Sequence, residues 1–283
     1  MALNNKIIIY SAESGISNPG KMIKSMIYDF EKSNALGLCL AKRNINALYR
    51  QSLLGYIWSV VPPLMTSLVW VFLNSQNVVS FSTGDIPYPL FVLTGTLLWQ
   101  IFSESILAPL KGVQTSLSML TKINFPRESL ILTGIYEVLF NSFIKLALIV
   151  GIFLYYNIVP GPSVVIALLG IITIIIFGST IGLLLTPIGL LYSDIGRGIG
   201  VILQFAIYLT PVIYPEPKSG IAAAFMKYNP LAELITITRN GLLESGFETG
   251  NLIFISILSF FMFLMGMFIY RIAMPIIIER VGS

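Results

Sequence analysis

Histidine is absent from the 283-residue sequence, and cysteine occurs once, as Cys39. The lack of histidine excludes zinc sites with histidine ligands and catalytic pairs in which histidine is the base. A lone cysteine excludes an internal disulfide bond. The sequence also contains no GxxxxGK[ST] phosphate loop, GxSxG elbow, HExxH helix or paired-carboxylate motif. We therefore expect no catalytic residues, no metal site and no cofactor in this chain.

Charged residues are also scarce. They make up 11% of the chain, against about 25% in soluble domains, while 55% of the residues are hydrophobic and the mean hydropathy is +0.85. This composition predicts an all-α polytopic membrane protein. The apolar run near the N-terminus, at residues 7–10, is too short for the core of a cleavable signal peptide.

Six apolar segments approach or exceed the roughly 20 residues that a membrane-spanning helix needs. We predict spans at 52–75, 88–110, 129–156, 163–191, 198–214 and 251–273. Residues 52–283 would form the six-span transmembrane domain, and residues 1–51 a cytoplasmic N-terminal region. Within the fourth span, Ile174 is expected to face lipid.

The N-terminal region carries its own helical pattern. Met22, Ile23, Met26, Ile27 and Phe30 recur at helical spacing, and lysines lie between them. This pattern is typical of a basic amphipathic helix lying at the membrane interface. The alternative is a cytosolic helix that packs on the protein itself.

Lysine and arginine are distributed unevenly over the predicted loops. If the N-terminus is cytoplasmic, 13 of the 17 basic residues lie on the cytoplasmic side and three lie outside, with Lys145 inside a span. Positively charged loops stay in the cytoplasm. Both termini are therefore expected to be cytoplasmic, in a multi-pass protein of the bacterial inner membrane.

The outer segment between the fifth and sixth spans, 215–250, contains two apolar pieces at about 219–228 and 230–243. Both are too short to span, and Pro215, Pro217 and Pro230 interrupt them. Apolar pieces of about 10–14 residues suit re-entrant or interfacial helices. We expect a re-entrant helical hairpin that closes the outer end of a pathway; a pair of helices resting on the outer surface is the alternative.

Few charges or close-packing motifs occur inside the spans. Glu104 lies in the second span, and Glu137 and Lys145 lie in the third. Such residues are functional candidates because burying a charge in lipid is unfavourable, but they could equally pair with polar neighbours on adjacent helices. Gly178 and Gly182 form a GxxxG pattern, which permits close helix packing within one subunit or between two.

Polar and aromatic residues form a stripe on two spans. Ser59, Thr66 and Trp70 share a face of the first span, and Gln204 and Tyr208 share a face of the fifth. These stripes suggest a hydrated route in which aromatic rings offer sliding contacts to sugars. Alternatively, the hydroxyl groups bond their own helices and the aromatic residues mark the interface belt.

The cytoplasmic segment between the second and third spans, 111–128, is long and basic. A turn needs only a few residues, yet this segment has a helix-like beginning and ends in Phe125-Pro126-Arg127. A short stiff helix here would transmit motion from a partner. Its basic residues would otherwise only fix the topology.

Taken in order, several short motifs resemble the membrane subunits of type-2 ABC exporters for cell-surface polysaccharides, the class that moves O-antigen, capsule or teichoic acid chains. The resemblance covers nearly the whole chain and departs from the family pattern at Asn44, Asn46, Leu48 and Ser193. The stretches that carry it are 43–58, 87–91, 99–103, 122–128, 211–215 and 229–230.

The resemblance implies an export function with a partner that supplies the energy. ATP and Mg²⁺ would bind to two copies of a separate ATPase subunit, and this chain would form a homodimer that passes a lipid-linked glycan through the membrane, without nucleic acid. The resemblance also implies two groups of residues. Those that couple to the ATPase would be Lys122, Phe125, Pro126, Arg127 and Glu128, and those of the outer gate would be Tyr214, Pro215, Asn229 and Pro230.

Two other functions are compatible with a polytopic helical protein. One is a type-2 ABC exporter of a drug or small lipid, against which the tyrosine and tryptophan stripe and the Pro87-Tyr88-Pro89 motif argue. The other is a membrane-embedded glycosyltransferase or acyltransferase, which would need a carboxylate or histidine cluster at a membrane face.

Overall fold

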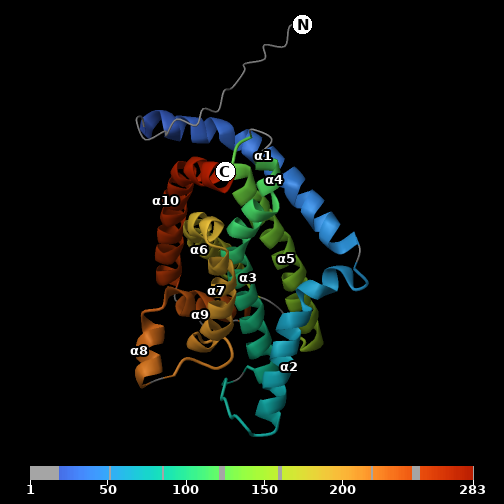
Figure 1. Ribbon diagram of the computed structural model, residues 1–283. Coiled ribbons are helices and arrows are strands. Elements are labelled where there is room, and N and C mark those ends of the chain that lie inside the picture. The colour runs from blue at the N-terminus through green and yellow to red at the C-terminus, as the bar shows by residue number, and fades with distance from the viewer. Residues whose placement is uncertain are drawn as a thin grey trace.

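The computed structural model describes residues 19–50, 52–84, 86–120, 125–158, 161–217, 219–243 and 249–282. Every regular element formed by these residues is a helix, as the composition predicts. The helices pack side by side into an elongated bundle (Figure 1). The C-terminus and the short helix α4, Leu117–Leu120, lie at the same end of the bundle.

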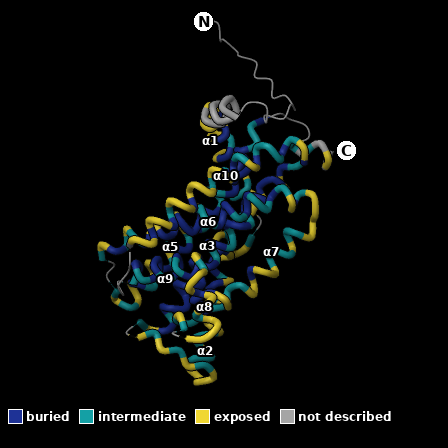
Figure 2. Tube along the Cα trace, turned by 90° about the vertical axis from the view of Figure 1, so that its left-hand side faces the viewer, coloured by how far each residue is buried: buried dark blue, intermediate teal, exposed yellow. Residues whose placement is uncertain are grey.

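Four helices among the described residues are long and apolar enough to cross a membrane. They correspond to the second, third, fourth and sixth predicted spans: α3 (Tyr88–Thr115), α5 (Glu128–Tyr155), α6 (Val164–Leu191) and α10 (Thr249–Gly282). In the most apolar stretch of α3, 78% of the residues are buried, whereas only 28% are buried in the most apolar stretch of α5 and in that of α10. Helix α3 is therefore the centre of the bundle, and Figure 2 shows the buried residues concentrated around α3 and α6.

The first predicted span is broken in the structure. The 3₁₀ helix η2, Gly55–Ser59, precedes α2, Val61–Ser75. Helix η2 begins at Gly55, whose φ of +50° suits glycine, and α2 begins after Val60 with prolines in its first turn. The 15 residues of α2 extend about 22 Å, short of the roughly 30 Å of hydrocarbon. A sixfold crossing of the membrane therefore stays a prediction.

The fifth predicted span is also short. It consists of α7, Ser193–Ala206, followed by the 3₁₀ helix η3, Ile207–Leu209. The chain then becomes irregular from Thr210, whose extended backbone ends the helical run.

The N-terminal helix α1, Pro19–Arg50, is much longer than the amphipathic pattern predicts. Its second half runs beside α5 (Figure 1). A Cβ atom on Gly37 would lie 2.9 Å from Cβ of Leu132, so the two helices are in close contact. Further along, Nδ2 of Asn44 donates a hydrogen bond of 2.8 Å to Oε1 of Glu137. This half of α1 therefore packs on the protein. The side chains of Met22, Ile23, Met26 and Ile27, which carry the amphipathic pattern, lie outside those that the structure describes, so the choice between the two interpretations for that pattern stays open.

The outer segment forms two short helices, α8 (Ile221–Lys227) and α9 (Pro230–Leu243), close to the two predicted apolar pieces. Most of α8 is exposed, whereas α9 is largely buried against α6 and α3. A Cβ atom on Gly170 of α6 would lie 2.1 Å from Oγ1 of Thr238, so only glycine allows α9 to come this close. The burial of α9 suits a re-entrant helix, whose backbone must be covered by protein at membrane depth.

The GxxxG pattern of α6 faces α3 of the same chain. A Cβ atom on Gly178 would lie 2.7 Å from Cβ of Ser105, and one on Gly182 would lie 2.1 Å from the carbonyl oxygen of Ile106. The structure therefore assigns this pattern to packing within one subunit. By contrast, Ile174 of α6 is 0% exposed, so the prediction that it faces lipid is wrong.

Candidate functional site

An aromatic cluster joins α2, α3 and the irregular segment after η3. Its members are Trp70, Phe81, Tyr88, Tyr208 and Tyr214, and we call it the aromatic cluster. The ring centroids of Trp70 and Tyr208 are 6.2 Å apart, and the ring of Phe81 stacks on that of Tyr214 at 5.8 Å. Separations of about 4.5–7 Å are typical of interacting aromatic rings. Two residues predicted from separate helices to line one route, Trp70 and Tyr208, are thus neighbours.

A surface remains open on this cluster. The side chain of Tyr208 is 48% exposed, and Trp70 is half-buried. The hydroxyl group of Tyr214 donates a hydrogen bond of 2.6 Å to the carbonyl oxygen of Tyr208, which fixes the two tyrosines relative to each other. The cluster therefore presents aromatic faces that are rigidly held and accessible.

The other predicted route residues behave differently. Ser59 is buried and its hydroxyl donates to the carbonyl of Tyr56 at 2.8 Å. The hydroxyl of Thr66 donates to the carbonyl of Pro62 at 3.0 Å, within its own helix. Both hydroxyls thus serve their own chain segment, as the alternative interpretation anticipates. Gln204 is exposed on α7.

The irregular segment 210–214 is buried except at Tyr214, and we call it the outer-gate loop because it leads to the predicted gate residues Tyr214 and Pro215. Val212 and Ile213 are both 0% exposed, although neither belongs to a helix. The hydroxyl of Tyr88 donates to the carbonyl oxygen of Ile213 at 3.1 Å, and Nη1 of Arg239 donates to that of Pro211 at 2.9 Å. Side chains of α3 and α9 thus replace the missing helical hydrogen bonds.

Sequence reasoning counted Arg239 as a charge of an outer loop, whereas the structure buries it within α9. The signal that could have revealed it is its position inside the apolar stretch 230–243, where an arginine needs specific partners. Sequence reasoning also missed Phe81 and Tyr88 as members of the aromatic cluster.

The remaining predicted gate residues lie around the start of α9. Oδ1 of Asn229 accepts a hydrogen bond of 3.0 Å from the backbone N–H of Leu231, and Pro230 is the first residue of the helix. Asparagine before the helix and proline at its first position are a typical helix start. Asn229 and Pro230 therefore fix where α9 begins, while Pro215 is a half-buried residue after Tyr214.

At the opposite end of the bundle, the predicted coupling segment is anchored from inside. Phe125 is 9% exposed and belongs to a core with Leu40, Val113 and Tyr270. The Phe125 ring therefore holds the segment to the bundle, and its role in coupling to the ATPase stays a prediction. Lys122 lies outside the described residues.

Polar contacts anchor the same segment. The hydroxyl of Tyr270 donates to the carbonyl of Arg127 at 3.3 Å. Arg271 of α10 forms ion pairs with Glu128 at 2.7 Å and with Asp29 of α1 at 3.1 Å. Glu128 is thus engaged internally, and α1, α5 and α10 are joined at one point. The hydroxyl of Ser129 donates a hydrogen bond of 2.6 Å to the carbonyl oxygen of Pro126.

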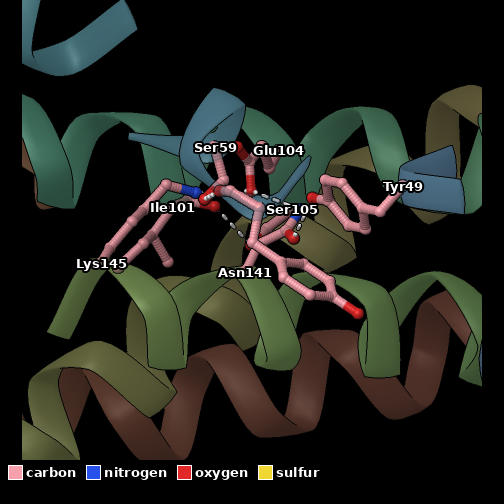
Figure 3. Close-up of polar contacts among 8 residues, drawn as sticks. Tyr49, Ser59, Ile101, Glu104, Ser105, Asn141 and Lys145 are labelled. Atoms are coloured by element: carbon pink, nitrogen blue, oxygen red, sulfur yellow. Dashed lines mark hydrogen bonds and ion pairs between the residues drawn. The ribbon is translucent and has the colours of Figure 1, made fainter. Parts of the chain in front are cut away.

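The three charged residues of the second and third predicted spans, Glu104, Glu137 and Lys145, pair with one another or with asparagine side chains. Nζ of Lys145 lies 2.7 Å from Oε2 of Glu104, and Nδ2 of Asn141 donates to the same oxygen at 3.4 Å. Figure 3 shows these three side chains pointing toward one another from α3 and α5. Tyr49 of α1 joins them by donating to Oδ1 of Asn141 at 3.3 Å. Burial, and then the nearby charge of Glu104, raise the pKa of Tyr49, so it remains a neutral donor.

No known family model matches this sequence. Similarity to individual proteins is nevertheless extensive. An O-antigen export system permease protein, RfbA, of Klebsiella pneumoniae is 28% identical over 228 residues, covering 78% of this chain and 84% of that protein. The protein of the same name in Myxococcus xanthus is 25% identical over 218 residues, covering 75% and 81% of the two chains. The chain is a distant homologue of O-antigen export permeases.

In this permease homologue, two candidate regions lie at opposite ends of the bundle. The aromatic cluster and the outer-gate loop occupy one end, and the anchored coupling segment occupies the other. Helix α3 connects them, because Tyr88 at its start belongs to the aromatic cluster and Val113 near its end packs with Phe125. This arrangement gives the two ends a common rigid element.

Proposed function

We propose that this chain is the membrane subunit of an ATP-driven exporter that moves a lipid-linked cell-surface polysaccharide from the cytoplasmic to the outer face of the inner membrane. The observation that carries the proposal is the accessible aromatic cluster in a homologue of O-antigen export permeases. ATP and Mg²⁺ would bind to a separate ABC ATPase subunit, present in two copies. Aromatic faces bind sugars weakly and without fixed direction, which suits a polymer that must slide.

The proposed route would be completed by a second copy of the chain. Apolar side chains are exposed on α2, at Val69 and Phe72, and on α7, at Ile202 and Phe205. Helix α2 carries Trp70, and Tyr208 follows α7 directly in η3, so both helices lead to the aromatic cluster. A homodimer joined along α2 and α7 would enclose the aromatic cluster between two subunits and cover these apolar residues.

We expect Trp70→Ala or Tyr208→Ala to slow export several-fold without preventing assembly with the ATPase. Stacking of a base on an aromatic ring contributes about 1–3 kcal/mol in single-stranded nucleic acids, and a sugar face gives less. The measurement is the export rate in reconstituted vesicles, together with photo-crosslinking from a reactive group placed at Trp70 or Tyr208.

The matched control is Ile172→Ala, because Ile172 on α6 is 51% exposed and lies outside the aromatic cluster. Glycan crosslinks at both aromatic positions would support the route. Crosslinks to phospholipid alone, with normal export by both aromatic variants, would remove the cluster from the route.

We further propose that the segment 111–128 receives the motion of the ATPase. The support is its rigid attachment: Phe125 is seated in a core, and Arg271 ties Glu128 to α1 and α10. Because Phe125 and Glu128 face inward, the contact with the ATPase would be made by the outer surface of the segment. Arg127, which is half-buried, lies at the edge of that surface.

Arg271→Gln should uncouple the exporter: we expect it to lower glycan-stimulated ATPase activity and export together. Removing one partner of a poorly exposed ion pair is unfavourable by about 3 kcal/mol and leaves Glu128 and Asp29 without this cation. Arg271→Lys should recover part of the activity, since it restores the charge but not the two-pronged geometry.

The control for this variant is Arg197→Gln, because Arg197 is exposed on α7. The measurement compares ATPase activity with and without glycan for all three variants. Full stimulation in Arg271→Gln, at normal amounts of assembled complex, would contradict the coupling role.

The proposed orientation places both termini and segment 111–128 in the cytoplasm, within a six-span protein. Two features support it. The C-terminus and α4 lie at one end of the bundle, and the aromatic cluster lies at the other. The amphipathic α1 lies at the first of these ends and would rest at the cytoplasmic interface with its N-terminal half.

A further inference from the structure

Arg239 is a buried cation in the outer half of the bundle. It is 2% exposed, and among the residues that the structure describes no carboxylate lies within ion-pair distance of it. Instead, Nη1 donates to the carbonyl oxygens of Pro211 at 2.9 Å and Val212 at 3.4 Å. Its guanidinium carbon lies 3.6 Å above the centre of the Phe91 ring. The partners of this charge are thus backbone carbonyls of the outer-gate loop and one aromatic face of α3.

The carbonyls need these donors because of where the loop lies. A Cβ atom on Gly95 would be 2.3 Å from the carbonyl oxygen of Val212, so the loop touches α3 about 10 Å along the helix from Tyr88. Backbone carbonyls at such a depth cannot turn to water. Arg239 satisfies Pro211 and Val212, and Tyr88 satisfies Ile213.

The loop also sets the position of the aromatic cluster. Tyr214 follows the three held carbonyls directly, and its hydroxyl binds the carbonyl of Tyr208. If the loop leaves Arg239, two carbonyls and a buried guanidinium lose their partners at once, which is strongly unfavourable. The loop therefore stays closed as long as the Arg239 bonds persist.

We infer that Arg239 is a positioning residue that latches the outer-gate loop onto α3 and α9 and so holds the outer end of the proposed route closed at rest. The inference rests on the proposed function only in its statement that a glycan route ends here. The attachment of the outer-gate loop to Arg239 does not depend on transport, and it is tested without transport.

The test measures how fast a small thiol reagent reacts with a cysteine placed at Val212, in a Cys39→Ser background, in purified protein held in lipid nanodiscs. Val212→Cys is nearly isosteric and its side chain is 0% exposed, so it reacts only when the loop opens. Adding Arg239→Met should raise the labelling rate about tenfold or more, because hydrogen bonds to a charged group are lost. Arg239→Lys, which keeps the charge, should give a smaller increase.

A second cysteine reports global loosening. Val138 of α5 is 2% exposed and lies on a helix that does not hold the loop, so labelling of Val138→Cys should stay unchanged when Arg239→Met is added. If the labelling rates at both positions increase equally, Arg239 stabilises the whole bundle, and the proposal that it holds the outer-gate loop is wrong. An unchanged rate at Val212→Cys would overturn it as well.

Gly95→Ala provides a second way to open the outer-gate loop, in case Arg239→Met fails to fold. The added Cβ would lie 2.3 Å from the carbonyl oxygen of Val212 and 3.2 Å from Nη1 of Arg239, so it forces the loop away from α3 without removing the guanidinium. Faster labelling of Val212→Cys, with Val138→Cys unchanged, is the expected result. Because labelling needs neither ATP nor glycan, a failure of the export proposal would leave this outcome unaffected, and the two are distinguished.

Discussion

Gly182→Ala should sharply reduce the amount of folded protein and lower the melting temperature of what remains. The added Cβ would lie 2.1 Å from the carbonyl oxygen of Ile106, a distance at which backbone and not a flexible side chain must move. Because α3 is the central helix and α6 packs along it, the displacement spreads over the largest helix contact of the bundle. Overpacking of this kind is unfavourable by about 3 kcal/mol.

The matched control is Gly151→Ala, in which the added Cβ meets no atom within 4 Å. Alanine favours helix over glycine by about 1 kcal/mol, so this control should be neutral or slightly stabilising. Thermal unfolding in detergent compares the two variants. Equal melting temperatures for Gly182→Ala and Gly151→Ala would show that α6 and α3 do not approach as closely as described.

The second large effect is expected for Lys145→Met, which leaves the carboxylate of Glu104 without its cation. The two groups are 2.7 Å apart, the lysine side chain is fully buried and that of the glutamate is 26% exposed. Breaking a buried pair from one side is unfavourable by about 3–5 kcal/mol. We therefore expect a large fall in the free energy of unfolding.

The double variant Lys145→Met/Glu104→Gln should regain much of this loss, because no unpaired charge remains and Asn141 still has an oxygen to bind. The measurement is a double-mutant cycle: the free energies of unfolding of the original protein, both single variants and the double variant are compared. If the double variant is no more stable than Lys145→Met, the loss of stability in Lys145→Met does not come from the unpaired carboxylate of Glu104. Normal export by a folded double variant would assign the pair to structure alone.

The long helices could be predicted because an uninterrupted apolar run leaves the chain little choice. The fourth predicted span, 163–191, is helix α6 at Val164–Leu191. The length of α1 was not predicted, because its apolar pattern was followed only to Phe30, whereas Leu36 and Leu40 of its second half pack in a core with Leu130 of α5, and Asn44 binds Glu137. The start of η2 depends on the backbone of Gly55, which the sequence alone does not distinguish from any helical glycine.

The direction of a side chain was the least predictable property. Helix α6 is apolar on all sides, so no pattern could tell that Ile174 faces the core while Ile172 is exposed. Phe125 lies in the segment between the second and third predicted spans, but its motif does not show whether the ring points into the bundle or outward. Trp70 and Tyr208 were each selected from their own predicted span, and only the structure shows that their rings meet.

The attachment of α1 to α5 also determines the order in which the protein assembles. Asn44 leaves the ribosome well before its partner Glu137, which follows 93 positions later. Until α5 is inserted, the apolar residues Leu36 and Leu40 have no protein surface to cover them. We therefore expect α1 to rest in the lipid interface during synthesis and to dock on α5 afterwards. Its dual character, apolar enough for lipid and polar enough to leave it, would then be a requirement of biogenesis as well as of the finished protein.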